Sequence, residues 1–200
     1  MNNQIKRQAR ITRYVFYKEF HFDRTNHLLT FLGAFIGIGA IGFLNKNSFL
    51  PIEQTFLIGS FGASSVLIYG AIKSPFSQPR NLIGGHLVSA LVGVTVYKLL
   101  PDQIWISAPL AVALATVAMQ ITKTVHPPGG ATALIAVIGT EKVKALGYFY
   151  VLSPVLSGVL ILFVVAMVVN NISKSRQYPA HGVFSKTFKE GTRFRLHKKK

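Results

Sequence analysis

The chain alternates between long apolar runs without a single charged residue and short polar connections. A bilayer core about 30 Å thick is crossed by about 20 helical residues. Several of the runs reach that length, so the pattern predicts a polytopic membrane protein of all-α class. The runs without Asp, Glu, Lys or Arg are residues 25–45, 54–72, 81–97, 103–122, 124–140 and 145–173.

Six membrane segments are expected from these runs. One of them, Pro128–Thr140, has an apolar core of only Ala131–Ile138, which is too short for an ordinary span. Broken backbone at membrane depth is tolerated where protein or a water-filled cavity surrounds it. We therefore predict a buried half-helix there, within a membrane helix bundle. The other five segments are predicted as long spans at residues 28–45, 54–72, 81–100, 104–122 and 145–170.

Basic residues are concentrated at the two ends of the chain. Six of the 22 Lys and Arg residues lie in residues 1–27 and nine in residues 171–200. Cytoplasmic segments of membrane proteins carry such an excess, so both termini are expected in the cytoplasm, at the cell membrane, with an even number of crossings. This divides the chain into a basic amphipathic N-terminal segment (1–27), a transmembrane domain (28–170) and a basic, disordered C-terminal tail (171–200). The net charge of +16 is explained in this way, and nucleic acid is not an expected partner.

Small residues recur at four-residue spacing on two of the predicted spans. Gly33 and Gly37 lie on the first, and Gly85, Ser89 and Gly93 on the third. Helices in lipid associate through close van der Waals approach, which small residues allow. These faces are therefore predicted helix–helix contacts.

Two stretches combine proline, glycine and histidine at the start of an apolar run: "SPFSQPRNLIGGH" (74–86) and "TVHPPGGAT" (124–132). Proline suits the first turn of a helix, and a helix N-terminus exposes N–H groups that bind anions. Glycine lets a ligand approach the backbone. The predicted structural prolines are Pro79, Pro127 and Pro128, and the predicted substrate-binding residues are Arg80, Asn81, Gly84, Gly85, His86, Thr124, His126, Gly129, Gly130 and Thr132.

The character of these side chains favours an anion as the ligand. No acidic residue occurs between Glu53 and Asp102 or between Asp102 and Glu141, whereas a cation pathway is expected to hold a carboxylate. The chain has no cysteine, and two histidines without a carboxylate do not form a metal site, so no cofactor, metal or enzymatic activity is expected. His126 titrates near pH 6.5 if unperturbed and is a candidate for coupling proton movement to the anion; the other reading is that its ring stays neutral in a packed loop.

Three segments together resemble the HPP family of integral membrane proteins: "GSFGASSVLIYG" (59–70), "SPFSQPRNLIGGHLVSALVG" (74–93) and "HPPGGATALIAV" (126–137). The resemblance implies a fold usually described with four spans and, from members linked to nitrite movement across plastid and cyanobacterial membranes, nitrite as a candidate cargo. The expected function is transport of a small inorganic anion, with membrane lipid as a further partner and homo-oligomer formation left open. The alternative is a scaffold or regulatory protein whose basic tails bind a partner or anionic lipid.

Overall fold

The computed structural model describes residues 24–47, 58–173 and 175–180, and the regular structure within these residues is entirely helical. The all-α prediction is therefore confirmed, while most of the predicted N-terminal segment lies outside the described residues. The elements in chain order are α2 (Arg24–Asn47), α3 (Gly59–Ser65), η1 (Val66–Gly70), η2 (Pro75–Ser77), α4 (Pro79–Leu99), α5 (Ile104–Ile121), α6 (Pro127–Ile138), α7 (Glu141–Ala145), η3 (Val151–Leu156) and α8 (Ser157–Val169).

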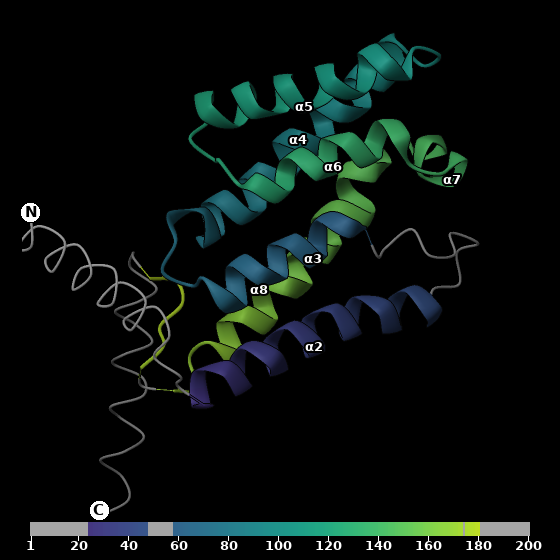
Figure 1. The fold of residues 1–200 in the computed structure, drawn as a ribbon. Helices are drawn as coiled ribbons and strands as arrows, with labels where there is room; N and C mark the ends of the chain where they lie inside the picture. The colour runs from purple at the N-terminus through teal and green to yellow at the C-terminus, as the bar shows by residue number, and fades with distance from the viewer. Residues whose placement is uncertain (1–23, 48–57, 174, 181–200) are drawn as a thin grey trace, which may run out of the picture.

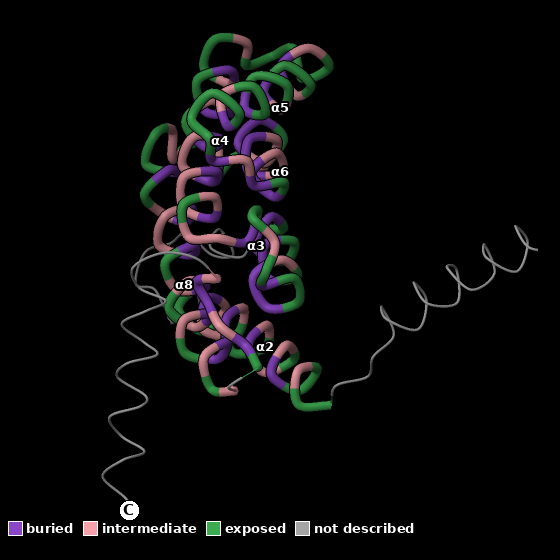
Figure 2. The backbone as a smooth tube through the Cα atoms, turned by 90° about the vertical axis from the view of Figure 1, so that its left-hand side faces the viewer, coloured by how far each residue is buried: buried purple, intermediate pink, exposed green. Residues whose placement is uncertain are grey.

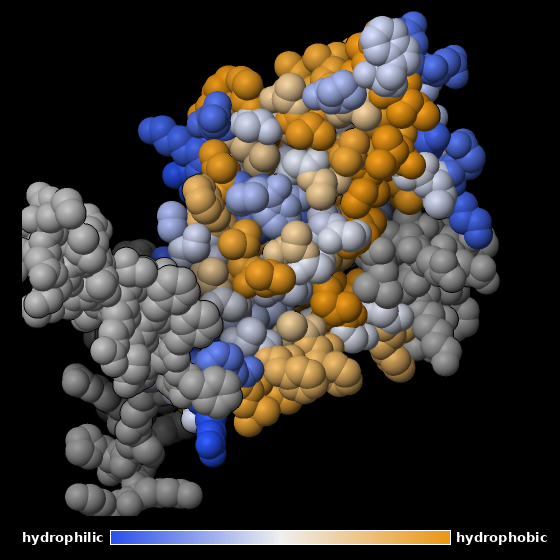
Figure 3. Space-filling view, viewed as in Figure 1, coloured by the Kyte–Doolittle hydropathy of each residue, from blue (hydrophilic) through white to orange (hydrophobic). Residues whose placement is uncertain are grey.

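Four helical segments in the described residues are long and apolar enough to cross a membrane: α2, α4, α5 and Val151–Val169, which η3 and α8 form with a kink at Ser153. They correspond to four of the five predicted long spans. Large apolar side chains project from their outer surfaces, including Phe35, Trp105 and Val164. In the view of Figure 3, hydrophobic residues cover much of the flank and the most hydrophilic ones gather towards its ends. The surface is thus suited to lipid.

The predicted span at 54–72 has a different structure in its described part. There the chain forms α3 and the π-helical η1, which run without interruption from Gly59 to Gly70. At about 1.5 Å per residue, such a helix is far shorter than a bilayer core. It lies between other layers of the bundle: Figures 1 and 2 show α5, then α4 and α6, then α3 and α8, and finally α2. One face of this segment is buried against protein, while Gly62 and Val66 on its other face are exposed.

The predicted half-helix is present as α6, a short apolar helix between Pro127 and Ile138. It packs against both α4 and α5. Its contact with α4 follows the predicted small-residue face. A Cβ atom on Gly85 would lie 2.5 Å from Cβ of His126, and one on Gly93 would lie 2.6 Å from the carbonyl oxygen of Ala133. The two backbones come this close only because α4 has no side chains at those positions.

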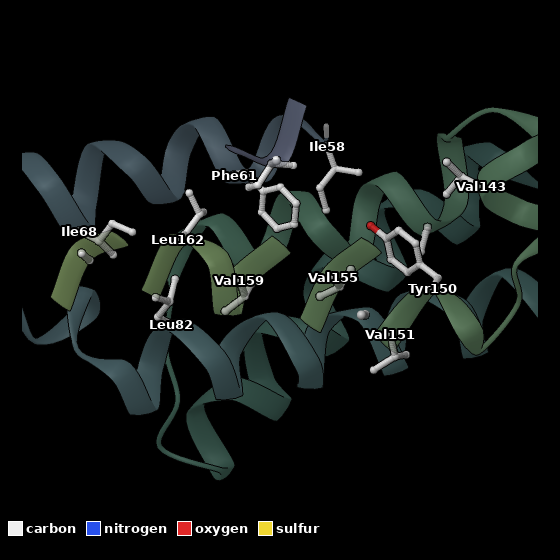
Figure 4. Close-up of a cluster of buried hydrophobic side chains, with 14 of the residues drawn as sticks. Ile58, Phe61, Ile68, Leu82, Val143, Tyr150, Val151, Val155, Val159 and Leu162 are labelled. Atoms are coloured by element: carbon white, nitrogen blue, oxygen red, sulfur yellow. The ribbon is translucent and has the colours of Figure 1, made fainter. Parts of the chain in front are cut away.

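The other predicted small-residue face, on α2, receives an aromatic ring. A Cβ atom on Gly33 would lie 2.5 Å from Cδ1 of Tyr69, and the hydroxyl of Tyr69 donates to the carbonyl of Leu162 in α8. Tyr69 therefore fills the space between α2 and α8. Buried apolar side chains from α3, α4, η3 and α8 continue this core, and Figure 4 shows Phe61 and Val159 among them.

The two ends of the described chain meet at one end of the bundle. Arg176 donates to the carbonyl of Asn26 at 2.7 Å, and the hydroxyl of Tyr178 donates to the carbonyl of Ser77 at 2.7 Å. Arg176 and Tyr178 are both buried. The packed domain therefore extends beyond residue 170, whereas the sequence predicted a disordered tail over residues 171–200. Residues 181–200 of that tail lie outside the described part of the chain.

This end of the bundle, which we call the basic face, holds basic side chains from several helix ends and turns. The two acidic residues of the described chain, Asp102 and Glu141, lie at the opposite end. There Lys98 lies over the ring of Tyr148 and Lys144 over that of Tyr97. Charge is therefore distributed unequally between the two ends, as the positive-inside rule anticipates. The residues of the basic face are Arg24, Lys73, Arg80, Lys123 and Arg176.

Candidate functional site

A single serine joins two histidines in the interior of the bundle. The Oγ atom of Ser64 lies 2.7 Å from Nε2 of His86 and 2.9 Å from Nε2 of His126. Nδ1 of His86 lies 2.7 Å from Oγ1 of Thr132, and Nδ1 of His126 lies 2.8 Å from the carbonyl oxygen of Phe76. Ser64, both histidines and Thr132 are fully buried. The four side chains form one continuous hydrogen-bonded chain, the Ser64–histidine centre.

Three helices and one turn bring these groups together. Ser64 lies in the last turn of α3, and His86 lies in the third turn of α4. His126 is the extended residue that precedes α6 (φ −137°, ψ 104°), followed by Pro127 and Pro128. Proline disfavours helical backbone at the residue before it and fits the first turn of a helix. The His-Pro-Pro sequence therefore ends the approaching turn at His126 and starts α6 directly behind it.

The orientation of the hydrogen bonds in the neutral centre follows from one group. The carbonyl of Phe76 can only accept, so Nδ1 of His126 carries a proton and its Nε2 accepts from Ser64. The only hydroxyl proton of Ser64 is then used, so Nε2 of His86 donates to Ser64 Oγ. Nδ1 of His86 accepts from the hydroxyl of Thr132. Each imidazole is thus neutral with both nitrogens hydrogen-bonded, and the two rings are opposite tautomers.

The predicted anion ligands Arg80 and Asn81 instead contact the turn that carries His126. Arg80 donates to the carbonyl of Thr122 at 3.0 Å, and Asn81 donates to that of Val125 at 2.7 Å. Thr124 is buried in the same turn. Both side chains come from the first turn of α4. The beginning of α4 therefore holds the turn before α6 in place, and anion binding by these two residues stays a prediction.

The predicted glycine cradles are occupied by protein. Gly84 and Gly85 lie in the second turn of α4 rather than at its N-terminus. A Cβ atom on Gly84 would lie 2.6 Å from Cγ2 of Thr124, and one on Gly129 would lie 2.7 Å from Oγ of Ser89. Gly130 has more room, with its nearest neighbour, Cγ1 of Val112, at 3.8 Å. Three of the four glycines, Gly84, Gly85 and Gly129, therefore serve close packing between segments of the protein.

The N-terminus of α6 is also used within the protein. Pro127 and Pro128 have no N–H group, and the N–H of Gly129 donates to the carbonyl of His126 at 2.7 Å. None of the first three residues of α6 therefore has an N–H available for a ligand in this geometry. Ligand binding at this helix start stays a prediction.

A pocket that the sequence motifs did not indicate opens at the basic face. Its volume is about 660 Å³. Three basic side chains, His27, Lys73 and Arg176, contribute to its lining, together with hydroxyl groups, and no acidic residue does. In the sequence, this region is indicated by Lys73, the basic residue that directly follows the apolar run 54–72. The remaining lining residues are Asn26, Thr30, Gly70, Ala71, Ile72, Ser74 and Ser175.

The Ser64–histidine centre contains atoms that are also used in nucleophilic catalysis, namely a hydroxyl, an imidazole and a carbonyl that orients it. Ser64 is fully buried, however, and in the neutral centre its oxygen accepts a proton from a second imidazole. That hydrogen bond withdraws electron density from the oxygen that would attack. Among the described residues, no group of three or more His, Cys, Asp or Glu could hold a metal ion. The arrangement favours a hydrogen-bond relay.

A helical bundle with apolar outer surfaces and a buried serine–histidine centre defines an integral membrane protein with a polar centre inside an apolar core. The chain belongs to the HPP family, since the model of the HPP transmembrane region matches residues 20–179. Two transmembrane proteins of Dictyostelium discoideum are similar to it. One is 46% identical over 153 residues, covering 75% of this chain and 49% of the relative, and the other is 43% identical over 155 residues, covering 76% and 54%. The chain spans about half the length of these relatives. No solved structure matches it.

Proposed function

We propose that this HPP-family chain conducts or transports a small inorganic anion, with nitrite as the first candidate because of the family resemblance. In this proposal the chain has six membrane segments, with α3–η1 and α6 as the two short ones, and lies in the cell membrane with both termini in the cytoplasm. The cytoplasmic side is then the basic face. The chain is assigned no catalytic activity and no cofactor.

The observation that carries this proposal is the pocket at the basic face. Lys73, His27 and Arg176 contribute positive or protonatable groups to it, and Thr30 and Ser74 add hydroxyl groups. A cleft lined by one sign of charge raises the local concentration of the opposite ion. The pocket is therefore suited to attract a small anion from the cytoplasm and is poorly suited to a cation.

The interior of the bundle is consistent with the same cargo. The four described helices of spanning length contain no Asp or Glu, whereas buried carboxylates are typical of cation and proton pathways. The buried polar side chains of the Ser64–histidine centre, Ser64, His86, His126 and Thr132, are all capable of donating a hydrogen bond. Such groups can replace part of the hydration shell of an anion.

Flux through the purified protein tests this function. Proteoliposomes loaded with nitrite, nitrate, chloride or potassium should release one or more of the anions faster than protein-free liposomes with the same load and should retain potassium. Lys73→Gln should lower the anion flux several-fold, most strongly at low ionic strength, where surface charge is least screened. Lys142→Gln removes an exposed charge from the opposite end and serves as the matched control, which we expect to keep most of the flux.

The outcome that contradicts the proposal is a folded protein without anion flux. It would favour the alternative function, a membrane scaffold or regulatory protein whose basic tails bind a partner or anionic lipid. An equal loss of anion flux in Lys73→Gln and Lys142→Gln would show that the flux does not depend on the pocket at the basic face.

A further inference from the structure

We propose that Ser64, His86 and His126 form one binding site for a single additional proton, which the two imidazoles share through the Ser64 hydroxyl. This deepens the proposed function, because it places a proton site inside the bundle through which the anion would move. The proton site rests on the hydrogen-bond geometry alone and does not require a particular cargo.

The protonated centre satisfies its hydrogen bonds with atoms that are already in place. If His126 gains a proton, its Nε2 donates to Ser64 Oγ instead of accepting from it, across the same 2.9 Å. The Ser64 hydroxyl then turns to the carbonyl of Ser60, which lies 3.0 Å away. Nε2 of His86 still donates to Ser64. One rotation of a hydroxyl group therefore converts the neutral centre into a complete cationic one.

The additional proton can also pass from one ring to the other. In the arrangement that allows this, the additional proton is on Nδ1 of His86, which donates to Thr132, whose hydroxyl turns to the carbonyl of Pro128 at 3.4 Å. Nε2 of His86 still donates to Ser64, and Ser64 still donates to Nε2 of His126. His86 gives its Nε2 proton to Ser64 as Ser64 gives its own proton to His126, so the charge moves between the rings while every oxygen keeps its number of protons. No heavy atom needs to move.

The centre is limited to one additional proton because the rings are close together. The ring centroids of His86 and His126 are 4.9 Å apart. Two positive charges at that separation repel each other strongly in a buried site. A second proton would also leave Ser64 accepting from two imidazolium groups. The two histidines are therefore expected to titrate as one unit.

The groups around the centre are neutral. Ser60 and Ser64 belong to α3, Thr132 belongs to α6, and the Phe76 carbonyl belongs to η2. The other titratable group nearby is Tyr150, whose hydroxyl donates to the carbonyl of Thr132 at 3.1 Å. In the described part of the chain, no Lys, Arg, Asp or Glu side chain hydrogen-bonds to these groups. The protonated centre thus has no neighbouring carboxylate, and an approaching anion would supply the opposite charge.

Nitrogen NMR of ¹⁵N-histidine in lipid bilayers tests the proton site directly. His21, His27, His181 and His197 are first replaced by Gln, so that the two buried histidines remain. At neutral pH we expect one ring with its proton on Nδ1 and the other with its proton on Nε2. On acidification both signals should shift together in a transition that takes up one proton.

Ser64→Ala should separate the two rings, so that their signals shift at different pH values. Ser65→Ala removes a neighbouring buried hydroxyl that has no hydrogen-bond partner among the described residues, and this control should keep the joint transition. Identical tautomers in the two rings at neutral pH, or separate transitions in the chain that retains Ser64, would overturn the proposal. If Ser64→Ala does not fold, the tautomers and the joint transition of the Ser64 chain decide the question. Absence of anion flux would leave these spectra unchanged, so the two proposals fail separately.

Discussion

Arg176 Nη1 donates a hydrogen bond to the main-chain carbonyl of Asn26 at 2.7 Å, which joins positions 150 residues apart in the chain. The same guanidinium donates to Thr30 and to the side chain of Asn170. The start of α2 and the segment after α8 are therefore fastened at the same end of the bundle. In a membrane this geometry requires an even number of crossings between the two.

The first prediction concerns topology. The chain has no native cysteine, so single cysteines report cleanly. Cysteines placed at Lys73 and Lys123, both on the basic face, should react in intact cells only with a membrane-permeant thiol reagent. Cysteines at Asp102 and Lys142, at the opposite end, should also react with an impermeant one. Labelling of Lys73 and Lys123 from different sides would rule out six alternating segments.

The second prediction separates packing from ligand binding at the Gly129-Gly130 pair. A Cβ atom on Gly129 would lie 2.7 Å from Oγ of Ser89 and 2.9 Å from Sδ of Met119. Gly129→Ala should therefore destabilise the protein by about 1–3 kcal/mol, the usual cost of overpacking. Gly130→Ala should be neutral or stabilise by up to about 1 kcal/mol, because the added methyl meets only an ordinary contact and alanine favours the helix. Unfolding in mixed micelles measures both effects.

The same two variants also test the predicted anion cradle. If Gly130 lines a ligand site, Gly130→Ala should lower anion flux without lowering stability. If flux is kept, Gly130 has no part in binding. A loss of stability on Gly130→Ala would contradict the packing described for α6.

The third prediction concerns the C-terminal boundary of the domain. A chain that ends after Ala180 should keep its thermal stability in detergent, since Arg176 and Tyr178 are retained. A chain that ends after Ser173 loses both, including the hydrogen bond from Tyr178 to Ser77. Hydrogen bonds of charged groups contribute about 1.5–3 kcal/mol each, so this deletion should cost roughly 3 kcal/mol or more. Equal melting temperatures for the two chains would show that residues 174–180 are not part of the packed domain.

The fourth prediction concerns the turn before His126. Lys123 has a positive φ of 56°, and the N–H groups of Lys123 and Thr124 donate to the carbonyls of Gln120 and Met119, as in a Schellman helix end. Left-handed backbone costs a residue with a Cβ about 1–2 kcal/mol. Glycine avoids this cost, but it offsets part of the gain because it loses more conformational entropy on folding. Lys123→Gly should therefore stabilise the protein by roughly 0.5–1 kcal/mol, measured by unfolding in micelles. A decrease would mean that the lysine side chain makes a compensating contact.

Much of the fold could be predicted from local patterns. Charge-free runs indicate membrane helices because lipid excludes charged side chains, and this applied to α2, α4, α5 and α8. The prolines of "HPPGG" indicated where α6 begins, since proline acts on its own turn. The prediction at 54–72 missed the short helix because apolarity alone does not show where a helix begins or which of its faces packs against protein. The serines at positions 60, 64 and 65 are the signal that this segment faces the interior.

The candidate site depended on contacts across the chain. His86 and His126 were singled out by their motifs, but Ser64, which joins them, is 62 residues away from His126 and looks like an ordinary polar residue within an apolar run. The roles of Arg80 and Asn81 were also undecided in sequence, because a donor can serve an anion or a carbonyl equally well.

The amino-acid sequence by itself determined the membrane class, the family, the positions of the broken helices and the unequal distribution of charge, because each of these follows from neighbouring residues and their interaction with lipid and water. Only the tertiary structure decided which polar groups meet. Hydrogen bonds act over about 3 Å, and the partners of Ser64 come within that distance only after α3, α4 and α6 have packed through their small residues. The proton site is therefore a property of the packed bundle, not of any one motif.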